Sequence, residues 1–533
     1  MEISQTGDTH AVENQAPPLA PYNVFEADVP LREALEREGG GWGVDRLLDT
    51  GELAGSPGAL EHSERAERNE PVLRTHDRFG NRIDEVDLDP SWHWCLRQAI
   101  EREVHSLPWR DAQPGGHVVR AALFFVWSQV NSGVMCPVSM TYSAIPALRE
   151  EPDIAAEWEP LLTSRAYDGA LRPAAEKGAA VCGMAMTEKQ GGSDVRANST
   201  RAAQDGDGWE STGHKWFCSY PPCDLFLTLA QAPAGLSCFM IEGRDPGFRI
   251  QRLKDKLGSR SLPSSEVEFH GVRAQLIGEE GGGVQTIIRM VNHTRLDCLI
   301  GSSAGMRWGL AQAVHHARHR SAFGKLLADQ PLMRNVLADL AIESEAATAV
   351  TMRVARAYDE DDAAFRRIAT AVMKHYVCKG APGHAVEALE CLGGNGYVEE
   401  SGMPRLLRDS PLNSIWEGSG NVSALDVLRA LLKEPEALPA LLAECELARG
   451  GNAMLDAHLD RVAATRAADP EFEARRVVSD LAVALQASLL VRHAPAAVSD
   501  AFCAARLEGV GRVYGTLRPG VDTEAILARA LPA

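Results

Sequence analysis

The stretch NSIWEGSGN (413–421) places one carboxylate, Glu417, between a tryptophan and a run of small residues. Small residues let a large, flat ligand come close to the backbone. Glu417 is therefore a candidate general base that faces a ligand. A charged side chain in a surface turn is the alternative interpretation of the same residues.

A second candidate segment, AMTEKQGGSDVRA (185–197), follows the apolar, strand-like run CGMAM. Its adjacent glycines would let backbone N–H groups approach an anion or the edge of a ring. Thr187 and Ser193 add two hydroxyls. Glycine pairs are also common in ordinary β-turns, so a turn without a ligand is the other interpretation.

The stretch GHKWFCSY (213–220) joins two adjacent aromatic residues to small polar ones. Trp216 and Phe217 would suit stacking on a planar heterocycle, with Ser219 as a hydrogen-bond partner at its edge. Aromatic residues in such a run also serve as core residues. For the single histidine, His214, a structural role is favoured over a catalytic one.

Two further stretches suggest contacts with phosphate. In RHRSAFGKLLADQ (318–330), Arg320 could hold a phosphate bidentately and Gln330 could read an adenine edge, although an arginine at a helix end also stabilises the helix dipole. ECLGGNGYVEESGMPRLLRD (390–409) contains a GGxG core like those of many phosphate loops. No strand clearly precedes it, so a dinucleotide-binding βαβ unit is not expected.

The spacing of apolar residues predicts the elements that position these stretches. Helical spacing dominates from about residue 90 to 180. Further on, DLFLTLAQA and LSCFMIEG flank the turn-like PAG and predict a hairpin, while SEVEFHGV alternates and places Val267 and Phe269 on one face of a strand. A small β-domain is therefore expected between helical segments.

Helical spacing returns after the β segment. MRNVLADLAIESEAATAVTMRVARAY is long and alanine-rich, and another Ala- and Leu-rich segment extends to the end of the chain. The first 85 residues are rich in Gly, Pro and acidic residues and predict an extended arm with short helices. We therefore expect an α+β protein with five segments: an arm (1–85), a helical domain (86–180), a β-domain (181–283), a helical bundle (284–440) and a C-terminal helical domain (441–533).

Composition narrows the class of protein. The chain has 533 residues, 45 % of them hydrophobic, which is ordinary for a folded globular protein. Its start is polar, its strongest apolar run is too short to cross a bilayer, and its 11 cysteines form no CxxC pair. We therefore expect reduced thiols, no metal site and a cytoplasmic location. The net charge of −19 repels DNA and anionic membranes unless a local basic patch compensates.

Together and in this order, these segments resemble one family over almost the whole chain. Residues 185–197 and 390–409 resemble the two signature segments of the acyl-CoA dehydrogenases. MTEKQGGSDV, GHKWF, LKDKLGSRS, QPLMR and PLNSIWEGSGN, with the long arm and the extra C-terminal helical domain, are similar to the AidB-type branch. Members of that branch are associated with the bacterial adaptive response to DNA alkylation.

The resemblance implies an FAD cofactor bound against the β-domain. The residues that it places at the flavin and its phosphates are Met186, Thr187, Gly192, Ser193, Trp216, Phe217, Ser219, Trp416, Ser419 and Asn421. Ser219 would lie near the reactive nitrogen of the ring. The residues that match positions reaching the FAD of a neighbouring subunit are Arg320, Phe323, Gln330, Gly393 and Gly394. Such shared sites imply an obligate oligomer, typically a homotetramer.

The resemblance also gives Glu417 a role. In this family a glutamate before the glycine of a YEG- or WEG-like turn removes the α-proton of a thioester, while the β-hydrogen leaves as hydride to the flavin. The site of Glu417 would have to be dry enough to raise the pKa of the carboxyl toward neutrality. Other members carry the base on a helix just before an arginine, where this chain has Thr294 before Arg295.

Arg429 follows Glu417 by twelve residues. This spacing resembles the AidB-type branch, in which the arginine lies near the glutamate. A nearby guanidinium would lower the pKa of the glutamate, weaken it as a base and narrow an acyl pocket.

Two functions remain open. One is FAD-dependent dehydrogenation of an acyl-CoA, for example a short branched-chain thioester. The other is protection of double-stranded DNA, by binding it through the C-terminal domain or by deactivating alkylating agents near it. Residues 430–533 hold 11 Lys and Arg against 14 Asp and Glu, which weakens that surface for DNA, although Arg461, Arg466, Arg475 and Arg476 could gather on one face.

Overall fold

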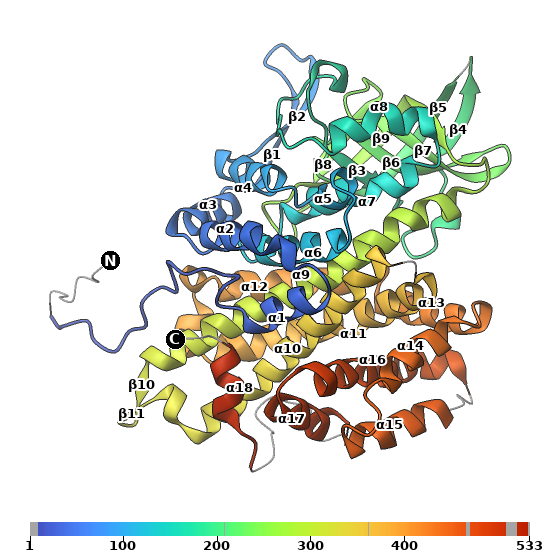
Figure 1. Ribbon diagram of the computed structural model, residues 1–533. Helices are drawn as coiled ribbons and strands as arrows, with labels where there is room; N and C mark the ends of the chain where they lie inside the picture. The colour runs from blue at the N-terminus through green and yellow to red at the C-terminus, as the bar shows by residue number, and fades with distance from the viewer. Residues whose placement is uncertain (1–8, 207, 361, 465–468, 508–519, 531–533) are drawn as a thin grey trace. The chain divides into compact units, whose positions relative to one another are not determined.

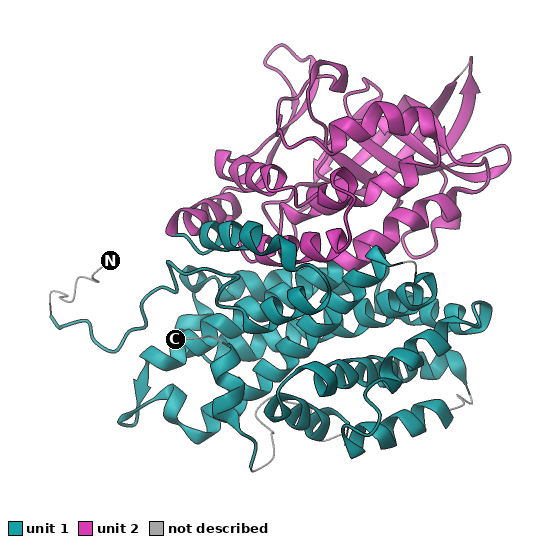
Figure 2. Ribbon diagram, in the orientation of Figure 1, with its two compact units in different colours: residues 1–56, 298–533 teal, residues 57–297 magenta. Residues whose placement is uncertain are grey.

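The structure is a computed structural model of the chain, and it describes residues 9–530 except 207, 361, 465–468 and 508–519. It contains two compact units (Figures 1 and 2). Residues 57–297 form the sheet unit, and residues 1–56 together with 298–533 form the helical unit.

The sheet unit begins with helices and ends with strands. Its first half contains α3 (Pro57–Arg68), β1 (Val72–His76), β2 (Arg82–Asp87), α4 (Pro90–Glu101), α5 (Leu107–Arg110), α6 (Gly116–Ser128), α7 (Met135–Leu148), α8 (Pro152–Leu162) and η2 (Ala174–Glu176). Its second half contains β3 (Cys182–Ala185), η3 (Val195–Ala197), β4 (Arg201–Asp205), β5 (Gly208–Ser219), β6 (Leu225–Ala232), β7 (Gly235–Glu242), β8 (Phe248–Leu253) and β9 (Ser264–Ile277). Helix α9 (Gly283–His319) starts here and continues into the helical unit.

Seven strands of this unit form one curved sheet (Figure 1). β4 pairs with β5, β5 with β9, β9 with β7, β7 with β6, and β6 with β4 through a parallel bridge between Arg201 and Gln231. These pairings close a ring, so the strands form a small barrel that β3 and β8 extend at β6 and β9. The β-domain expected from the sequence is confirmed.

The patterns that predicted these strands correspond to their burial. The hairpin predicted around PAG is formed by β6 and β7, which run antiparallel with Ala232 opposite Gly235. In β9, Val267 and Phe269 are buried, whereas Glu268 on the other face is not. Alternation therefore located both the strand and its buried face.

The helical unit contains the remaining elements. Its N-terminal part contains α1 (Val29–Arg37), η1 (Gly41–Gly43) and α2 (Val44–Ala54). After α9 come β10 (Ser321–Ala322), β11 (Lys325–Leu326), η4 (Leu327–Asp329), α10 (Pro331–Asp359), α11 (Ala363–Glu390), η5 (Gly393–Tyr397), η6 (Glu399–Ser401), α12 (Met403–Asp409), η7 (Leu412–Ser414) and α13 (Gly420–Lys433). The C-terminal part adds α14 (Ala437–Glu446), α15 (Ala453–Ala464), α16 (Pro470–His493), α17 (Ala496–Arg506) and α18 (Thr523–Ala530).

Capping residues set the starts of several helices in this unit. The side chains of Asp28, Asp362 and Asp469 accept hydrogen bonds from backbone N–H groups three residues on, at the starts of α1, α11 and α16. α10 starts at Pro331, where a missing N–H leaves no helical hydrogen bond unmade. α11 packs against α10 and α13, and α16 packs against all three. The C-terminal helices therefore share the core of the bundle.

Two expectations from composition concern the whole chain. All 11 cysteines are free thiols, and all but Cys136 are buried. Among the described residues, no helix combines the length and the apolar character that crossing a bilayer requires.

Candidate functional site

In the sheet unit, the structure brings two of the predicted segments together. The Trp216 N–H donates to the Thr187 carbonyl at 2.8 Å, so the end of β5 lies beside the loop that follows β3. Asn198 Nδ2 donates to the Met186 carbonyl at 2.8 Å. The backbone of Met186 and Thr187 is therefore fixed by neighbours from two other segments.

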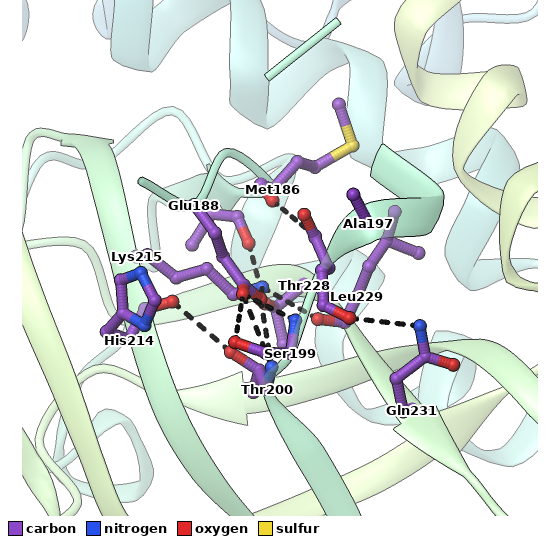
Figure 3. Close-up of polar contacts among 12 residues, drawn as sticks. Met186, Glu188, Ala197, Ser199, Thr200, His214, Lys215, Thr228, Leu229 and Gln231 are labelled. Atoms are coloured by element: carbon purple, nitrogen blue, oxygen red, sulfur yellow. Dashed lines mark hydrogen bonds and ion pairs between the residues drawn. The ribbon is translucent and has the colours of Figure 1, made fainter. Parts of the chain in front are cut away.

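The next residue, Glu188, is the centre of a buried polar network (Figure 3). Its carboxylate accepts a hydrogen bond from Lys215 Nζ at 2.9 Å, and both side chains are 0 % exposed. The backbone N–H groups of Ser199 and Thr200 donate to the same carboxylate at 2.7 and 3.2 Å. One carboxylate thus fastens both ends of the glycine-containing loop 189–198.

The charges of this pair explain its stability. Burial raises the pKa of Glu188, but the Lys215 ammonium and the hydrogen bonds from Thr200 and Ser199 outweigh it and lower that pKa from 4.5 to about 2. Burial lowers the pKa of Lys215, and the facing carboxylate opposes that shift. Because every side of the Glu188 carboxylate is engaged, we assign it a structural role.

Glu188 and Lys215 lie in two of the segments predicted to form the site, but neither was predicted to have a role. The available signal was a lysine beside aromatic residues in a strand, where a charge needs a buried partner. His214 has the structural role that its context favoured, because its Nε2 accepts a hydrogen bond from the Lys189 N–H at 3.2 Å.

Trp216 and Phe217 form a partly open aromatic surface. Their ring centroids are 6.4 Å apart with an interplanar angle of 88°, and Phe217 is 49 % exposed. Lys254 Nζ lies 3.4 Å from the centroid of Trp216 and is also bound by Glu266 at 2.8 Å. Ser219, two residues beyond Phe217, is half-buried at the end of β5.

These residues fit a flat, anionic ligand such as a flavin nucleotide. The aromatic surface can cover a ring, and Lys254, paired with Glu266, packs on the indole of Trp216 and holds it in place. Gly192 and Ser193 are exposed in the loop held by Glu188. In the part of the chain that the structure describes, Asn198 Oδ1 is buried without a hydrogen-bond partner, and a ligand donor could satisfy it.

In the helical unit, Glu417 lies in a tight loop between η7 and α13. Its φ is 56° and that of Gly418 is 100°, both in the left-handed region. A residue other than glycine pays about 1–3 kcal/mol for that conformation, so neighbouring groups must hold it. Trp416 Nε1 donates to Asn413 Oδ1 at 2.8 Å, and Ser423 Oγ donates to the Gly418 carbonyl at 3.1 Å. Glu417 itself is half-buried.

Two residues of α11 also hold this loop, and sequence reasoning missed both. Lys374 is 1 % exposed, and its Nζ donates to the carbonyls of Trp416, at 2.8 Å, and of Gly418. His375 Nδ1 hydrogen-bonds to the Gly420 carbonyl at 2.9 Å. Burial lowers the pKa of His375, which keeps its imidazole neutral at pH 7.

Two further residues bear on the assignment of Glu417 as the base: a predicted neighbour, Arg429, and Thr294, which stands at the alternative position of the base. Arg429 lies on α13 with its side chain 63 % exposed and its Nη1 3.5 Å from Asp426 Oδ1. Its predicted influence on Glu417 stays a prediction. Thr294, at the alternative position of the base, donates its hydroxyl to a backbone carbonyl inside α9. This chain therefore has no acid at that position.

The start of α13 carries the other two predicted FAD contacts of this loop. Ser419 is the N-cap residue of α13 and is half-buried. Asn421 is exposed, and its Oδ1 accepts a hydrogen bond from Arg475 Nε at 2.8 Å. Because Arg475 belongs to α16, the C-terminal segment of the chain reaches a predicted cofactor residue.

Three of the residues predicted to reach a neighbouring subunit, Arg320, Phe323 and Gln330, lie in or beside a small hairpin. Phe323 is at the tip between β10 and β11, with φ 53° and a side chain that is 100 % exposed. Gln330 Nε2 donates to the Ala322 carbonyl at 3.0 Å, and Arg320 Nη1 donates to the Asn14 carbonyl at 2.5 Å. The hairpin therefore presents the ring of Phe323 to solvent, where a second molecule could reach it.

The N-terminal arm joins this hairpin to the GGNGY turn. Asn14 contacts Arg320, while the next residue, Gln15, accepts a hydrogen bond from Asn395 Nδ2 at 3.2 Å. Gly393 has φ 59°, which suits glycine, and Gly394 is open to solvent. The structure therefore brings Arg320 and the glycine turn into one neighbourhood through arm residues that sequence reasoning missed.

The C-terminal arginines that the structure describes have partners within the chain. Arg476 pairs with two carboxylates of its own helix, α16. Arg475 is engaged by Asn421, and Arg461 hydrogen-bonds to the ring of a neighbouring histidine at 3.1 Å. Arg466 lies outside the described residues. Carboxylates therefore offset the charge of Arg476, while Arg475 and Arg461 remain exposed.

Comparison with protein families divides the chain into three matches. Residues 14–169 match the N-terminal domain of the adaptive response protein AidB. Residues 183–272 match the acyl-CoA dehydrogenase middle domain, and residues 281–432 match the acyl-CoA dehydrogenase C-terminal domain. The middle-domain match covers most of the barrel, and the C-terminal match contains the Glu417 loop.

Individual proteins show the same similarity. The chain is 40 % identical over 517 residues to the putative acyl-CoA dehydrogenase AidB of Escherichia coli (strain K12), covering 95 % of this chain and 96 % of that protein. It is similar to the structure of Bd2924 in its apo form, with a TM-score of 0.81, 30 % identity and coverage of 90 % and 99 %. It is also similar to Caenorhabditis elegans ACDH-11 in complex with C11-CoA, with a TM-score of 0.82, 27 % identity and coverage of 97 % and 92 %.

The Glu188–Lys215 pair gives a first prediction. Glu188→Gln keeps the shape but leaves a buried ammonium without its counter-charge, so we expect a loss of about 3–5 kcal/mol in the free energy of unfolding, measured by chemical denaturation at pH 7. Because the folded pKa of Glu188 is depressed from 4.5 to about 2, its contribution is present above the unfolded pKa. In the unmodified protein, the stability that Glu188 contributes should disappear as the pH falls from 4.5 to about 2. The variant should lack this part of the pH dependence.

The matched control is Glu268→Gln on β9. Its carboxylate is 3.1 Å from His270 and its side chain is partly exposed, so we expect a change of at most about 1 kcal/mol. Equal effects of the two substitutions would contradict the special role of the buried pair.

Proposed function

The chain belongs to the acyl-CoA dehydrogenase family, in its AidB-type branch, and we propose that it uses FAD to oxidise an acyl-CoA thioester. The observation that carries the proposal is the loop of Glu417. It presents a carboxylate on a braced, left-handed backbone, at the sequence position that the resemblance assigns to the base.

FAD would be held in the sheet unit by the aromatic surface and the loop that Glu188 fastens. Trp216 and Phe217 would cover the ring, and Ser219 would meet its reactive nitrogen. The other contacts proposed there are Met186, Thr187, Gly192 and Ser193. When bound, FAD accepts a hydride from the β-carbon of the thioester.

Glu417 would remove the proton from the α-carbon. As the Cα–H bond breaks, its electron pair forms the Cα–Cβ double bond, and the carboxylate of Glu417 takes the proton. Lys374 and Ser423 hold the backbone beside Glu417 through the Gly418 carbonyl. The backbone from which the Glu417 carboxylate extends would therefore be fixed before the substrate binds. A bound acyl chain would displace water from this half-buried carboxylate and raise its pKa toward neutrality.

The proposed substrate class is acyl-CoA. ACDH-11, to which this chain is similar over 97 % of its length, was solved in complex with C11-CoA. A longer acyl chain therefore belongs in the test beside the short branched-chain thioesters that the AidB resemblance implies. If Arg429 narrows the pocket, as the branch suggests, short chains would react faster.

We also propose a homotetramer in which each FAD meets residues of a second chain. The hairpin with Phe323 supports this proposal, because it exposes the whole ring at a position that the resemblance assigns to the FAD of a neighbouring subunit. Gln330 and Arg320 brace the hairpin from within its own chain, which leaves the ring of Phe323 for a partner. Gly393 and Gly394 would serve the same FAD.

Protection of DNA from alkylation is the competing function. Its support is the match to the AidB N-terminal domain. Against direct DNA binding stand the net charge of −19 and the engaged arginines of α16. We therefore place the dehydrogenase chemistry first.

The proposed base is tested by Glu417→Gln. We expect the purified variant to retain its yellow flavin, while bleaching of the flavin by acyl-CoA becomes about 10²–10⁴-fold slower or is lost, because the amide cannot take the α-proton. The rate of bleaching would be measured from absorbance spectra recorded with a series of acyl-CoAs, from short branched-chain thioesters to an eleven-carbon chain. Glu436→Gln, at an exposed position before α14, is the matched control. Bleaching at the rate of the unmodified protein in Glu417→Gln would reject the assignment.

The oligomer is tested by Phe323→Ser. The ring of Phe323 is fully exposed and does not pack in the core of its own chain, so the substitution should leave the folding of each single chain unchanged. We expect a smaller mass by light scattering and weaker retention of FAD. Phe472→Ser, which removes a ring that is 88 % exposed on α16, should change neither quantity. Unaltered mass and FAD content in Phe323→Ser would contradict the shared site.

DNA binding is tested by a salt titration with duplex DNA. Each phosphate contact steepens the fall of the logarithm of affinity with the logarithm of salt concentration by about 0.9. We expect weak binding with a shallow slope, and no change on Arg476→Gln, because that arginine already pairs with Glu473 and Asp480. A steep slope that Arg476→Gln reduces would instead establish a phosphate-binding face on α16.

A further inference from the structure

Lys374 differs from the other buried lysines in the described part of the chain. Lys177 and Lys215 are also buried, and each pairs with a carboxylate, Asp224 and Glu188 respectively. The hydrogen bonds of Lys374 Nζ instead go to two neutral carbonyl oxygens. A buried ammonium carries a large desolvation cost, so a lysine is a poor choice for packing alone.

The two carbonyls stand on either side of Glu417. One belongs to Trp416, at 2.8 Å from Nζ, and the other to Gly418. Both are tied to a single atom, which restricts the backbone torsions of Glu417 and Gly418 between them. These are the two residues of the loop with positive φ, 56° and 100°.

Other hydrogen bonds complete the support of this segment. Ser423 Oγ binds the Gly418 carbonyl at 3.1 Å from the first turn of α13, and His375 Nδ1 binds the Gly420 carbonyl at 2.9 Å. Lys374 is the member that reaches both sides of Glu417. Since α11 is a long helix packed against α10 and α13, the ammonium is fixed in the bundle core.

We propose that Lys374 is a positioning residue for the base: by clamping the carbonyls of Trp416 and Gly418, it fixes the strained backbone that directs the Glu417 carboxylate to the α-carbon of the thioester. The inference rests on the proposed function of Glu417. A carboxylate on an unclamped loop would sample directions away from the substrate, and a misplacement of about 1 Å can cost about 100-fold in rate.

The test is Lys374→Met, which keeps the length of the side chain but removes its donors and charge. We expect the rate at which the α-proton of a bound acyl-CoA exchanges with deuterated solvent to fall about 100-fold, with the dissociation constant for acyl-CoA changed less than about threefold. In the same variant, amide hydrogen exchange of a peptide covering residues 413–421 should become faster. FAD content should stay as in the unmodified protein.

Two further variants make the result specific. Lys374→Gln keeps an N–H₂ donor group on a shorter, uncharged side chain, so it should recover part of the lost exchange rate. Lys433→Met removes an exposed lysine at the other end of α13 and should change neither measurement. If Lys374 had a purely structural role, its substitution would lower the midpoint of thermal unfolding. The Lys374→Gln and Lys374→Met variants would then show the same rate of α-proton exchange.

The outcomes separate this inference from the proposed function. If the unmodified protein exchanges no α-proton with any acyl-CoA, the proposed function falls, and the amide exchange of residues 413–421 still decides the role of Lys374. Folded Lys374→Met with unchanged amide and α-proton exchange would overturn the inference. Failure of both Lys374 variants to fold would assign the lysine to bundle stability and overturn it as well.

Discussion

A buried ammonium holds each of the two loops on which the proposed chemistry depends. In the sheet unit, Lys215 binds the Glu188 carboxylate, which in turn accepts the backbone N–H groups at the far end of the glycine loop. In the helical unit, Lys374 acts on the backbone directly, through the carbonyls beside Glu417. The physical reason is common to both. Glycine-rich loops that must let a ligand come close have few side chains with which to hold themselves, so their conformation has to be imposed from the core.

The two glutamates show how the same side chain acquires different roles. Glu188 is wholly buried and surrounded by donors, and its pKa falls to about 2, so it stays charged and serves as an anchor. Glu417 is half-buried, and the carbonyls on either side of it are held by Lys374. A general base needs this second arrangement, because its carboxylate must accept a proton during the reaction and release it afterwards.

The fold was predictable where a single hydrophobic period dominated, and candidate site residues could be proposed only where they stood next to each other in sequence. Alternation located β9 and its buried face, and the turn residues between two apolar runs located the hairpin of β6 and β7. The Glu417 loop was recognisable because its chemistry lies within one short stretch. Lys374 was not, because a lysine in a helical stretch is usually solvated, and only tertiary packing places it 43 residues upstream of the loop that it holds. Its apolar context, IATAVMKHYVC, was the available signal.

The C-terminal helices illustrate a limit on reasoning from charge counts. Their arginines suggested a DNA face, yet in the structure Arg475 binds Asn421 at the start of α13 and Arg476 binds carboxylates of α16. The carboxylates offset the charge of Arg476, whereas the bond of Arg475 to an amide leaves its charge in place and ties α16 to α13. In a chain with a net charge of −19, this internal use of arginine is expected, because acidic neighbours outnumber basic ones and compete with any phosphate. The same helices therefore fit a role in supporting the segment 413–421 that contains Glu417. Arg475 of α16 contacts the last residue of this segment, Asn421, directly.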